Sequence, residues 1–172
     1  ILKLKKDPHF IEKYNLDGKK EIITLMPGSR KQEIKKILPI FIDVVNKFKS
    51  YQFVIAAAPS IEPEFYLSIV KNNSIKIIHN NSYDLLIHSK AALVTSGTAT
   101  LETALLKIPQ LVCYKTSLVS FFIAKRLVKL NYISLVNLIL NKEVVKELIQ
   151  KNCNAKKITE ELKELLMRKN KS

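Results

Sequence analysis

The sequence is poor in residues that crosslink a chain or bind metals. It has two cysteines, Cys113 and Cys153, and three histidines in 172 residues. The cysteines lie far apart, so neither a disulfide framework nor zinc-ligand spacing is present. His79 and His88 have no Cys or carboxylate partner at ligand spacing, and we interpret both as structural or exposed. This composition predicts no metal site and favours a reducing, cytoplasmic setting.

Signals for export, repeats and membrane spans are also lacking. The first ten residues are interrupted by lysines and contain Pro8, so they do not resemble a signal peptide. The most apolar long stretch, residues 116–130, carries too many charges to span a bilayer. The chain has no linker or low-complexity segment, and it does not begin with Met. We therefore expect it to begin inside a longer protein.

Acidic residues are few, because 15 Asp and Glu face 29 Lys and Arg. The net charge of +14 fits three partners: nucleic acid, an anionic membrane, or a phosphorylated small substrate. The basic residues are scattered, however, and biased composition explains them equally well. With 47% hydrophobic residues, the chain can bury a full core as one domain.

Apolar runs and helical patterns alternate along the chain. Residues 1–20 read as a connector into a domain that covers residues 21–172. Strands are predicted at 22–26, 51–58, 74–78, 91–94 and 110–114, and helices at 29–48, 62–70, 83–88, 99–106, 142–150 and 155–168. We expect Ser29 with Gln32 to form a capping box at the start of the helix at 29–48. We expect Ser82 to cap the short helix at 83–88. The alternation predicts an α/β fold, a Rossmann-like parallel sheet with helices on both faces.

A strand, a tight turn and a helix follow one another in residues 91–106. The turn contains Ser96, Gly97 and Thr98, and a helix N-terminus binds anions through its unpaired N–H groups. Gly97 permits close approach of a phosphate, while Glu102, four residues after Thr98, suits ribose hydroxyls. The alternative is that these residues only cap the helix. Neither a Walker loop nor GxGxxG is present.

A second turn of this kind follows the first predicted strand. Residues 27–30 read PGSR, which places Ser29 and Arg30 at the start of a helix. A guanidinium there can bind a phosphate with two hydrogen bonds, and it opposes the dipole of its own helix. The alternative is that Arg30 is only a solvated arginine in the first turn of the helix. Two such turns at the carboxyl edge of one sheet favour a nucleoside diphosphate ligand.

Two later features leave alternatives open. Asn137 is a lone polar residue in an apolar run, so it either satisfies backbone groups or reaches into a site. Residues 118–130 form an ordinary packed helix or lie on a membrane surface. In the second case the aromatic side chains insert and the basic ones meet the headgroups. The membrane-facing residues are then Phe121, Phe122, Lys125, Arg126 and Lys129.

Four segments, in the same order, resemble signature segments of the lipid-A-disaccharide synthase family. They are residues 25–30 (LMPGSR) with Glu33 and Leu38-Pro39, 95–102 (TSGTATLE), 124–138 (AKRLVK and YISLVNL) and 142–150 (KEVVKELIQ). The segments cover most of the chain. The resemblance implies the GT-B glycosyltransferase architecture, and the chain resembles its C-terminal, donor-binding half.

The family resemblance implies a role for each site residue. Ser29 and Arg30 match the position of the UDP phosphates, and residues 96–98 form the diphosphate cradle. Glu102 matches the nucleoside end, and Asn137 matches an asparagine in the donor site. No metal is implied, because helix N-termini and Arg30 stabilise the leaving UDP.

The implied reaction inverts the anomeric centre. UDP-2,3-diacylglucosamine and 2,3-diacylglucosamine 1-phosphate give the β-1,6 disaccharide of lipid A and UDP. Because both substrates are acylated, the resemblance implies a peripheral location on the inner face of the bacterial inner membrane.

The sequence departs from the family pattern in two respects. Val136 replaces a proline, and the N-terminal half, with the acceptor site and the general base, is absent. The chain alone is therefore expected to bind UDP weakly and to catalyse nothing. Alternatives are another GT-B enzyme similar to UDP-N-acetylglucosamine 2-epimerase, and a non-catalytic module that binds a membrane or nucleic acid. Clustered basic residues or a nucleic-acid-binding motif are lacking, so we expect no nucleic-acid partner.

Overall fold

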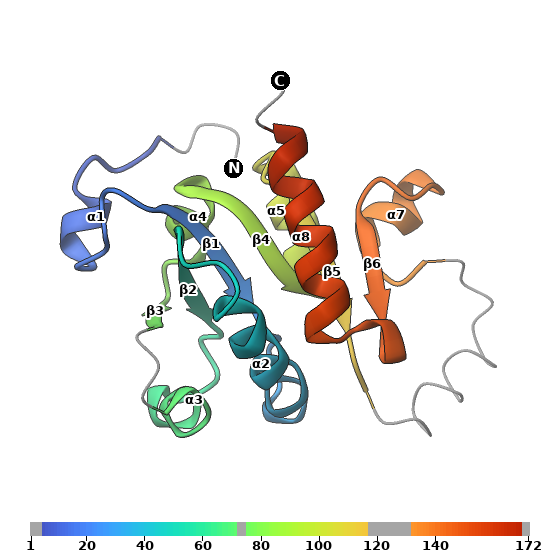
Figure 1. Cartoon of the computed structure of the whole chain (residues 1–172), viewed down its shortest axis with the longest axis horizontal. Coiled ribbons are helices and arrows are strands. Elements are labelled where there is room, and N and C mark those ends of the chain that lie inside the picture. The colour runs from blue at the N-terminus through green and yellow to red at the C-terminus, as the bar shows by residue number, and fades with distance from the viewer. Residues whose placement is uncertain (1–4, 72–74, 117–131, 170–172) are drawn as a thin grey trace.

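The computed structural model describes residues 5–71, 75–116 and 132–169, and it contains a six-stranded sheet with helices on both faces (Figure 1). Strands and helices alternate through most of the chain, as predicted. In chain order the elements are α1 (Phe10–Lys13), β1 (Glu21–Met26), α2 (Lys31–Val45), β2 (Tyr51–Ala57), α3 (Pro63–Val70), β3 (Lys76–His79), α4 (Ser82–Ile87), β4 (Ser89–Thr95), α5 (Thr98–Leu105), β5 (Gln110–Tyr114), α7 (Leu135–Leu140), β6 (Lys146–Ile149), the 3-10 turn η1 (Gln150–Asn152) and α8 (Ala155–Lys169).

All strand pairings are parallel, and the order across the sheet is β3-β2-β1-β4-β5-β6. The order reverses between β1 and β4, which pair directly although β2 and β3 lie between them in the chain. Met26, the last residue of β1, is opposite Val94, so both strands end at the same edge. A reversal of this kind opens a crevice at the carboxyl ends of the two strands.

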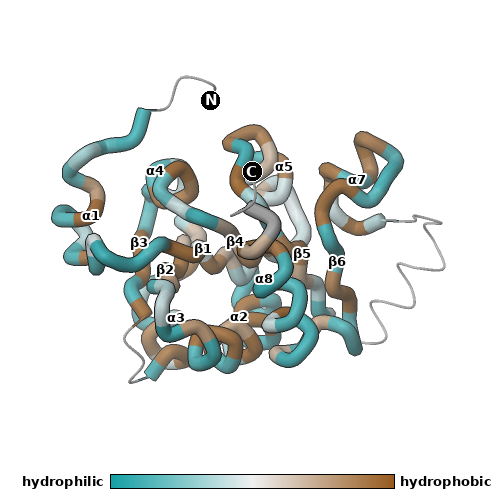
Figure 2. The backbone as a smooth tube through the Cα atoms, turned by 45° about the horizontal axis from the view of Figure 1, so that its top comes forward, coloured by the Kyte–Doolittle hydropathy of each residue, from teal (hydrophilic) through white to brown (hydrophobic). Residues whose placement is uncertain are grey.

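Successive side chains of each strand point to opposite faces of the sheet. In β1, Ile23 and Leu25 pack into a large cluster with α2, α3 and α8, whereas Ile22 and Met26 face the smaller clusters that include α1, α4 and α5. Figure 2 shows that the strands are mostly hydrophobic and that the segment around α1 is mostly hydrophilic. Burial on both faces explains why the strands read as continuous apolar runs.

The predicted helix at residues 142–150 is wrong. The segment forms β6 and the start of η1, and β6 pairs with β5 from Lys146 opposite Leu111 to Ile149 opposite Tyr114. Leu148 is 3% exposed in the large core cluster. Pairing with an open sheet edge therefore overrides the helical propensity of Lys and Glu. A smaller error concerns α4, whose cap is Asn81 rather than Ser82.

Glu147 on β6 accepts hydrogen bonds from the segment that leads into α7. Its carboxylate accepts from the Ile133 N–H (2.9 Å) and from the Ser134 N–H (3.0 Å) and hydroxyl (2.7 Å). The Asn137 Nδ2 also donates to it, at 2.8 Å. This one carboxylate ties α7 to the edge of the sheet.

The two cysteines, distant in sequence, meet in the core as free thiols on β5 and just before α8. A hydrogen bond to Cys153 and complete burial raise the pKa of the Cys113 thiol well above its usual value. Cys113 is therefore a neutral core side chain.

The proposed membrane-facing side chains of Phe121, Phe122, Lys125, Arg126 and Lys129 lie outside the described residues. Within the described ranges, none of the helices has the length and apolar character needed to cross a bilayer.

Glu147→Ala is expected to lower the free energy of unfolding by about 2–4 kcal/mol, because it leaves several donors around α7 without their charged acceptor. Urea denaturation measures the change. The matched control is Glu143→Ala, since Glu143 is exposed and pairs only at the surface with Lys146, at 3.6 Å. The control is expected to change stability by less than about 0.5 kcal/mol. Equal effects of the two substitutions would contradict the assigned role of Glu147.

Candidate functional site

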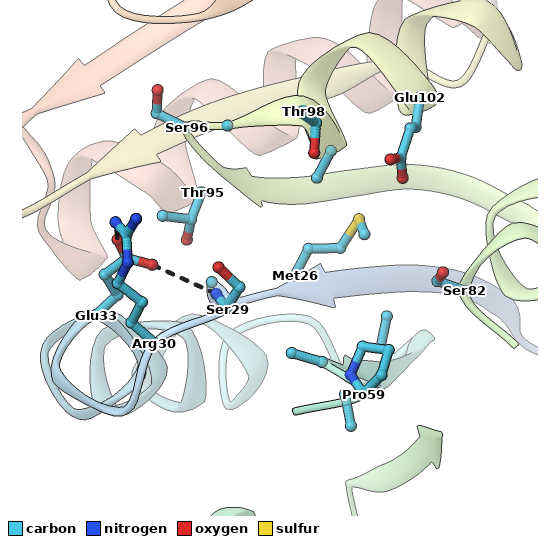
Figure 3. A pocket seen from close by; sticks show the side chains of 16 residues that line it. Met26, Ser29, Arg30, Glu33, Pro59, Ser82, Thr95, Ser96, Thr98 and Glu102 are labelled. Carbon is cyan, nitrogen blue, oxygen red and sulfur yellow. Dashed lines mark hydrogen bonds and ion pairs between the residues drawn. The ribbon is translucent and has the colours of Figure 1, made fainter. Parts of the chain in front are cut away.

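A cavity of about 320 Å³ lies at the carboxyl ends of β1, β2 and β4. It occupies the point where the strand order reverses. Arg30 and Glu102 lie at opposite ends of this cavity, and Thr98 lies near Glu102 (Figure 3). The predicted residues of both turns line it, namely Ser29, Arg30, Ser96, Gly97, Thr98 and Glu102. The structure thus brings together six of the seven predicted binding residues.

The β4–α5 turn depends on Gly97. Its φ of 154° and ψ of −165° belong to a region of backbone conformation that residues other than glycine rarely adopt. Ser96 donates its hydroxyl to the Ile133 carbonyl at 3.0 Å, and Thr100 donates to the Gly97 carbonyl at 2.8 Å. These bonds hold the turn so that α5 begins at Thr98 with its N-terminus at the cavity.

The β1–α2 turn depends on Gly28, whose φ is 116°. A Cβ on Gly28 would lie 2.7 Å from the Glu33 Oε2. The predicted capping box of Ser29 and Gln32 is wrong, because Arg30 is the cap residue and α2 begins at Lys31. The third helical residue is consequently Glu33, whose Oε2 accepts from the Ser29 N–H at 3.4 Å.

Glu33 also fixes Arg30. The Arg30 Nη1 lies 3.1 Å from the Glu33 Oε1, and the Arg30 side chain is 80% exposed at the mouth of the cavity. The guanidinium therefore has donors left for a ligand. Sequence reasoning used Glu33 only as part of a motif, although its place three residues after the cap is a local signal.

Glu102 lines the cavity one helical turn after Thr98 and lies close to Tyr83 of α4. Its negative charge raises the pKa of the Tyr83 phenol. Tyr83 itself does not line the cavity, and nothing local in the sequence indicates its contact with Glu102.

Asn137 does not line the cavity. It is fully buried, and its Oδ1 accepts from the Val144 and Val145 N–H groups while its Nδ2 donates to the Val145 carbonyl and to Glu147. Its amide is thus used within the protein. Asn137 is linked to the site only indirectly, through Glu147. The Glu147 carboxylate also accepts from the Ile133 N–H, and the Ile133 carbonyl accepts from the Ser96 hydroxyl of the β4–α5 turn.

His88 is a structural residue, as predicted. His88 stacks on Phe10 with 4.3 Å between ring centroids, and its ring nitrogens contact the Asp84 and Asp7 carbonyls. Among the residues that the structure describes, no three His, Cys, Asp or Glu side chains are grouped as metal ligands.

Solved structures of other proteins share the fold of this chain. The chain aligns over 97% of its length with 54% of the E. coli ADP-heptose LPS heptosyltransferase II, with a TM-score of 0.71 and 13% identity. It aligns over 98% of its length with 41% of a putative UDP-N-acetylglucosamine 2-epimerase from Listeria monocytogenes, with a TM-score of 0.61 and 17% identity. The fold is that of a Rossmann-like domain of the GT-B glycosyltransferases.

Sequence comparison narrows the class to one family. The family model described as lipid-A-disaccharide synthetase matches residues 1–172. The lipid-A-disaccharide synthase of Persephonella marina is 39% identical over 162 residues, which are 87% of this chain and 42% of that protein. The chain belongs to the lipid-A-disaccharide synthetase family, and it spans about two-fifths of this relative's length.

Gly28→Ala is expected to destabilise the chain by about 1–3 kcal/mol, because alanine is strained at a positive φ and its Cβ meets Glu33. Gly18→Ala is the matched control, since a Cβ there meets only the Ile11 side chain at 3.8 Å. Urea denaturation of both variants measures the difference. A Gly28→Ala variant as stable as the control would show that this turn is not strained.

Glu102→Gln is expected to lower the pKa of Tyr83 towards its ordinary value, because it removes the nearby negative charge. Phenolate then forms at lower pH, which ultraviolet absorbance detects. The Tyr83→Phe substitution, made both in the wild type and in Glu102→Gln, separates the absorbance change of Tyr83 from that of the other five tyrosines. Identical Tyr83 titrations with and without Glu102 would disprove the contact.

Proposed function

We propose that this chain is the nucleotide-sugar-binding half of a lipid-A-disaccharide synthase. One observation carries the proposal: the N-termini of α2 and α5 open on one cavity, with Arg30 at one end and Glu102 at the other. Helix N-termini and a guanidinium attract a diphosphate, and a carboxylate accepts from ribose hydroxyls. In this proposal residues 21–172 bind the UDP-sugar, and residues 1–20 connect to a preceding half.

Each residue has a role that follows from its contacts. Arg30 binds the phosphates with the donors that Glu33 leaves available. Gly97 and Thr98 offer backbone N–H groups at the start of α5. Ser96 contributes its N–H group, because its hydroxyl hydrogen is donated to Ile133. Ser29 supplies a hydroxyl opposite, and Asn137 acts as a positioning residue through Glu147.

The proposed reaction joins UDP-2,3-diacylglucosamine to 2,3-diacylglucosamine 1-phosphate. The 6-hydroxyl of the acceptor attacks the anomeric carbon from the face opposite UDP, so the configuration inverts. The bond from that carbon to the UDP oxygen breaks, and UDP leaves with the electron pair. Arg30 and the two helix N-termini stabilise the growing negative charge without a metal. A general base in the preceding half takes the hydroxyl proton.

We place this function in the cytoplasm, on the inner face of the bacterial inner membrane, because both proposed substrates carry acyl chains. Phe121 and Phe122 are proposed to insert among the lipids, while Lys125, Arg126 and Lys129 meet anionic headgroups. The family match covers the whole chain and favours this function over an epimerase, which the fold alone supports.

Arg30→Ala is expected to weaken UDP binding about tenfold or more, because it removes a charge-assisted hydrogen bond to phosphate. Arg30→Lys is expected to lie between Arg30→Ala and the wild type, because it keeps the charge and loses the fork of donors. Calorimetric titration with UDP measures the dissociation constants. Lys36→Ala, which removes a positive charge from the exposed side of α2, is expected to leave binding nearly unchanged.

The same titration tests the proposed function itself. Saturable but weak UDP binding, with no turnover of the acylated substrates, is expected of the 172-residue chain alone. A folded wild-type chain without UDP binding would overturn the donor-site assignment. Turnover by this chain alone would instead show that the general base does not belong to the preceding half.

A further inference from the structure

Thr95, the last residue of β4, carries a hydroxyl that the protein leaves unpaired. The residue is 4% exposed, and its Oγ1 is shielded from solvent with no hydrogen-bond partner among the described residues. Other buried threonines are paired: the Thr24 hydroxyl contacts the Ser89 hydroxyl at 2.6 Å, and the Thr103 hydroxyl donates to the Ala99 carbonyl at 2.7 Å.

An unpaired buried hydroxyl lowers stability, because it has lost water without gaining a partner. Valine has nearly the same shape and lacks this defect. The orphan hydroxyl of Thr95 is therefore not explained by packing in the unliganded chain. Its position supplies the explanation, since Thr95 lines the cavity described above.

The hydroxyl is placed between the two anion-binding turns. β1 and β4 pair up to Met26 opposite Val94, and Thr95 follows directly. Figure 3 shows the Thr95 hydroxyl oxygen pointing toward Ser29, which belongs to the β1–α2 turn and also lines the cavity. Ser29 is exposed and lines the same cavity, so the proposed contact requires its side chain to turn from the Thr95 oxygen toward the bound ligand.

We propose that the Thr95 hydroxyl donates a hydrogen bond to a phosphate oxygen of the nucleoside diphosphate held between the α2 and α5 N-termini, an inference that rests on the proposed function. Thr95 is then a further binding residue at the floor of the site. The side chains of Ser29, Arg30 and Thr98 bind the same group from the rim.

The test compares Thr95→Val with Thr24→Val, the same substitution at a paired threonine of the neighbouring strand. For Thr95→Val, we expect a melting temperature equal to or above that of the wild type, and UDP affinity lowered about threefold to tenfold. For Thr24→Val, we expect a lower melting temperature, because the buried hydrogen bond between the Thr24 and Ser89 hydroxyls is lost, and unchanged UDP affinity. Thr95→Ser keeps the hydroxyl and is expected to retain most of the affinity.

Each of the following results would overturn the inference. Thr95→Val with wild-type UDP affinity overturns the inference, although the proposed function survives. A Thr95→Val chain that unfolds at lower temperature, as Thr24→Val is expected to do, also overturns it, because the hydroxyl then has a partner within the protein. Absence of UDP binding by the folded wild-type chain overturns the proposed function, and the inference with it.

Discussion

The direct pairing of β1 with β4 is the constraint on which the site depends. It reverses the strand order, and it brings two turns that are distant in sequence to one edge of the sheet. A buried contact between the Thr24 and Ser89 hydroxyls joins the same two strands. Helices on both faces then follow, because each strand buries side chains in both directions. Without this pairing, Arg30 and Glu102 would not share a cavity.

The positive charge of the chain is not concentrated at this cavity. Its lining holds one arginine and two glutamates, although the whole chain carries a net charge of +14. Attraction for an anion therefore depends on backbone N–H groups at two helix starts, assisted by one guanidinium. The scattered lysines act elsewhere or reflect composition. This arrangement suits a ligand with a diphosphate at one end and hydroxyl groups at the other.

Most of the fold was predictable, because its signals are local. Apolar runs followed by small residues marked both strand–turn–helix units that form the cavity. The segment around Glu147 was not predictable, since its strand depends on β5 and on Asn137, far from any local pattern. The cap residue of α2 is Arg30, two residues after Gly28, whose positive φ was not predicted. The unpaired hydroxyl of Thr95 could not be predicted either, because it is defined by the lack of a hydrogen-bond partner among the described residues in three dimensions.

The Arg30–Glu33 ion pair has a consequence for the lifetime of a bound anion. Glu33 lies beside Arg30 in the unliganded chain, so a phosphate that binds Arg30 in this arrangement shares the guanidinium with an internal carboxylate. Because Arg30 is largely exposed, this competition is modest, at most about 1 kcal/mol. It nevertheless accelerates departure of the ligand more than its arrival, because most differences in affinity appear in the dissociation rate. A site of this kind releases its anion faster than one in which the guanidinium has no internal partner.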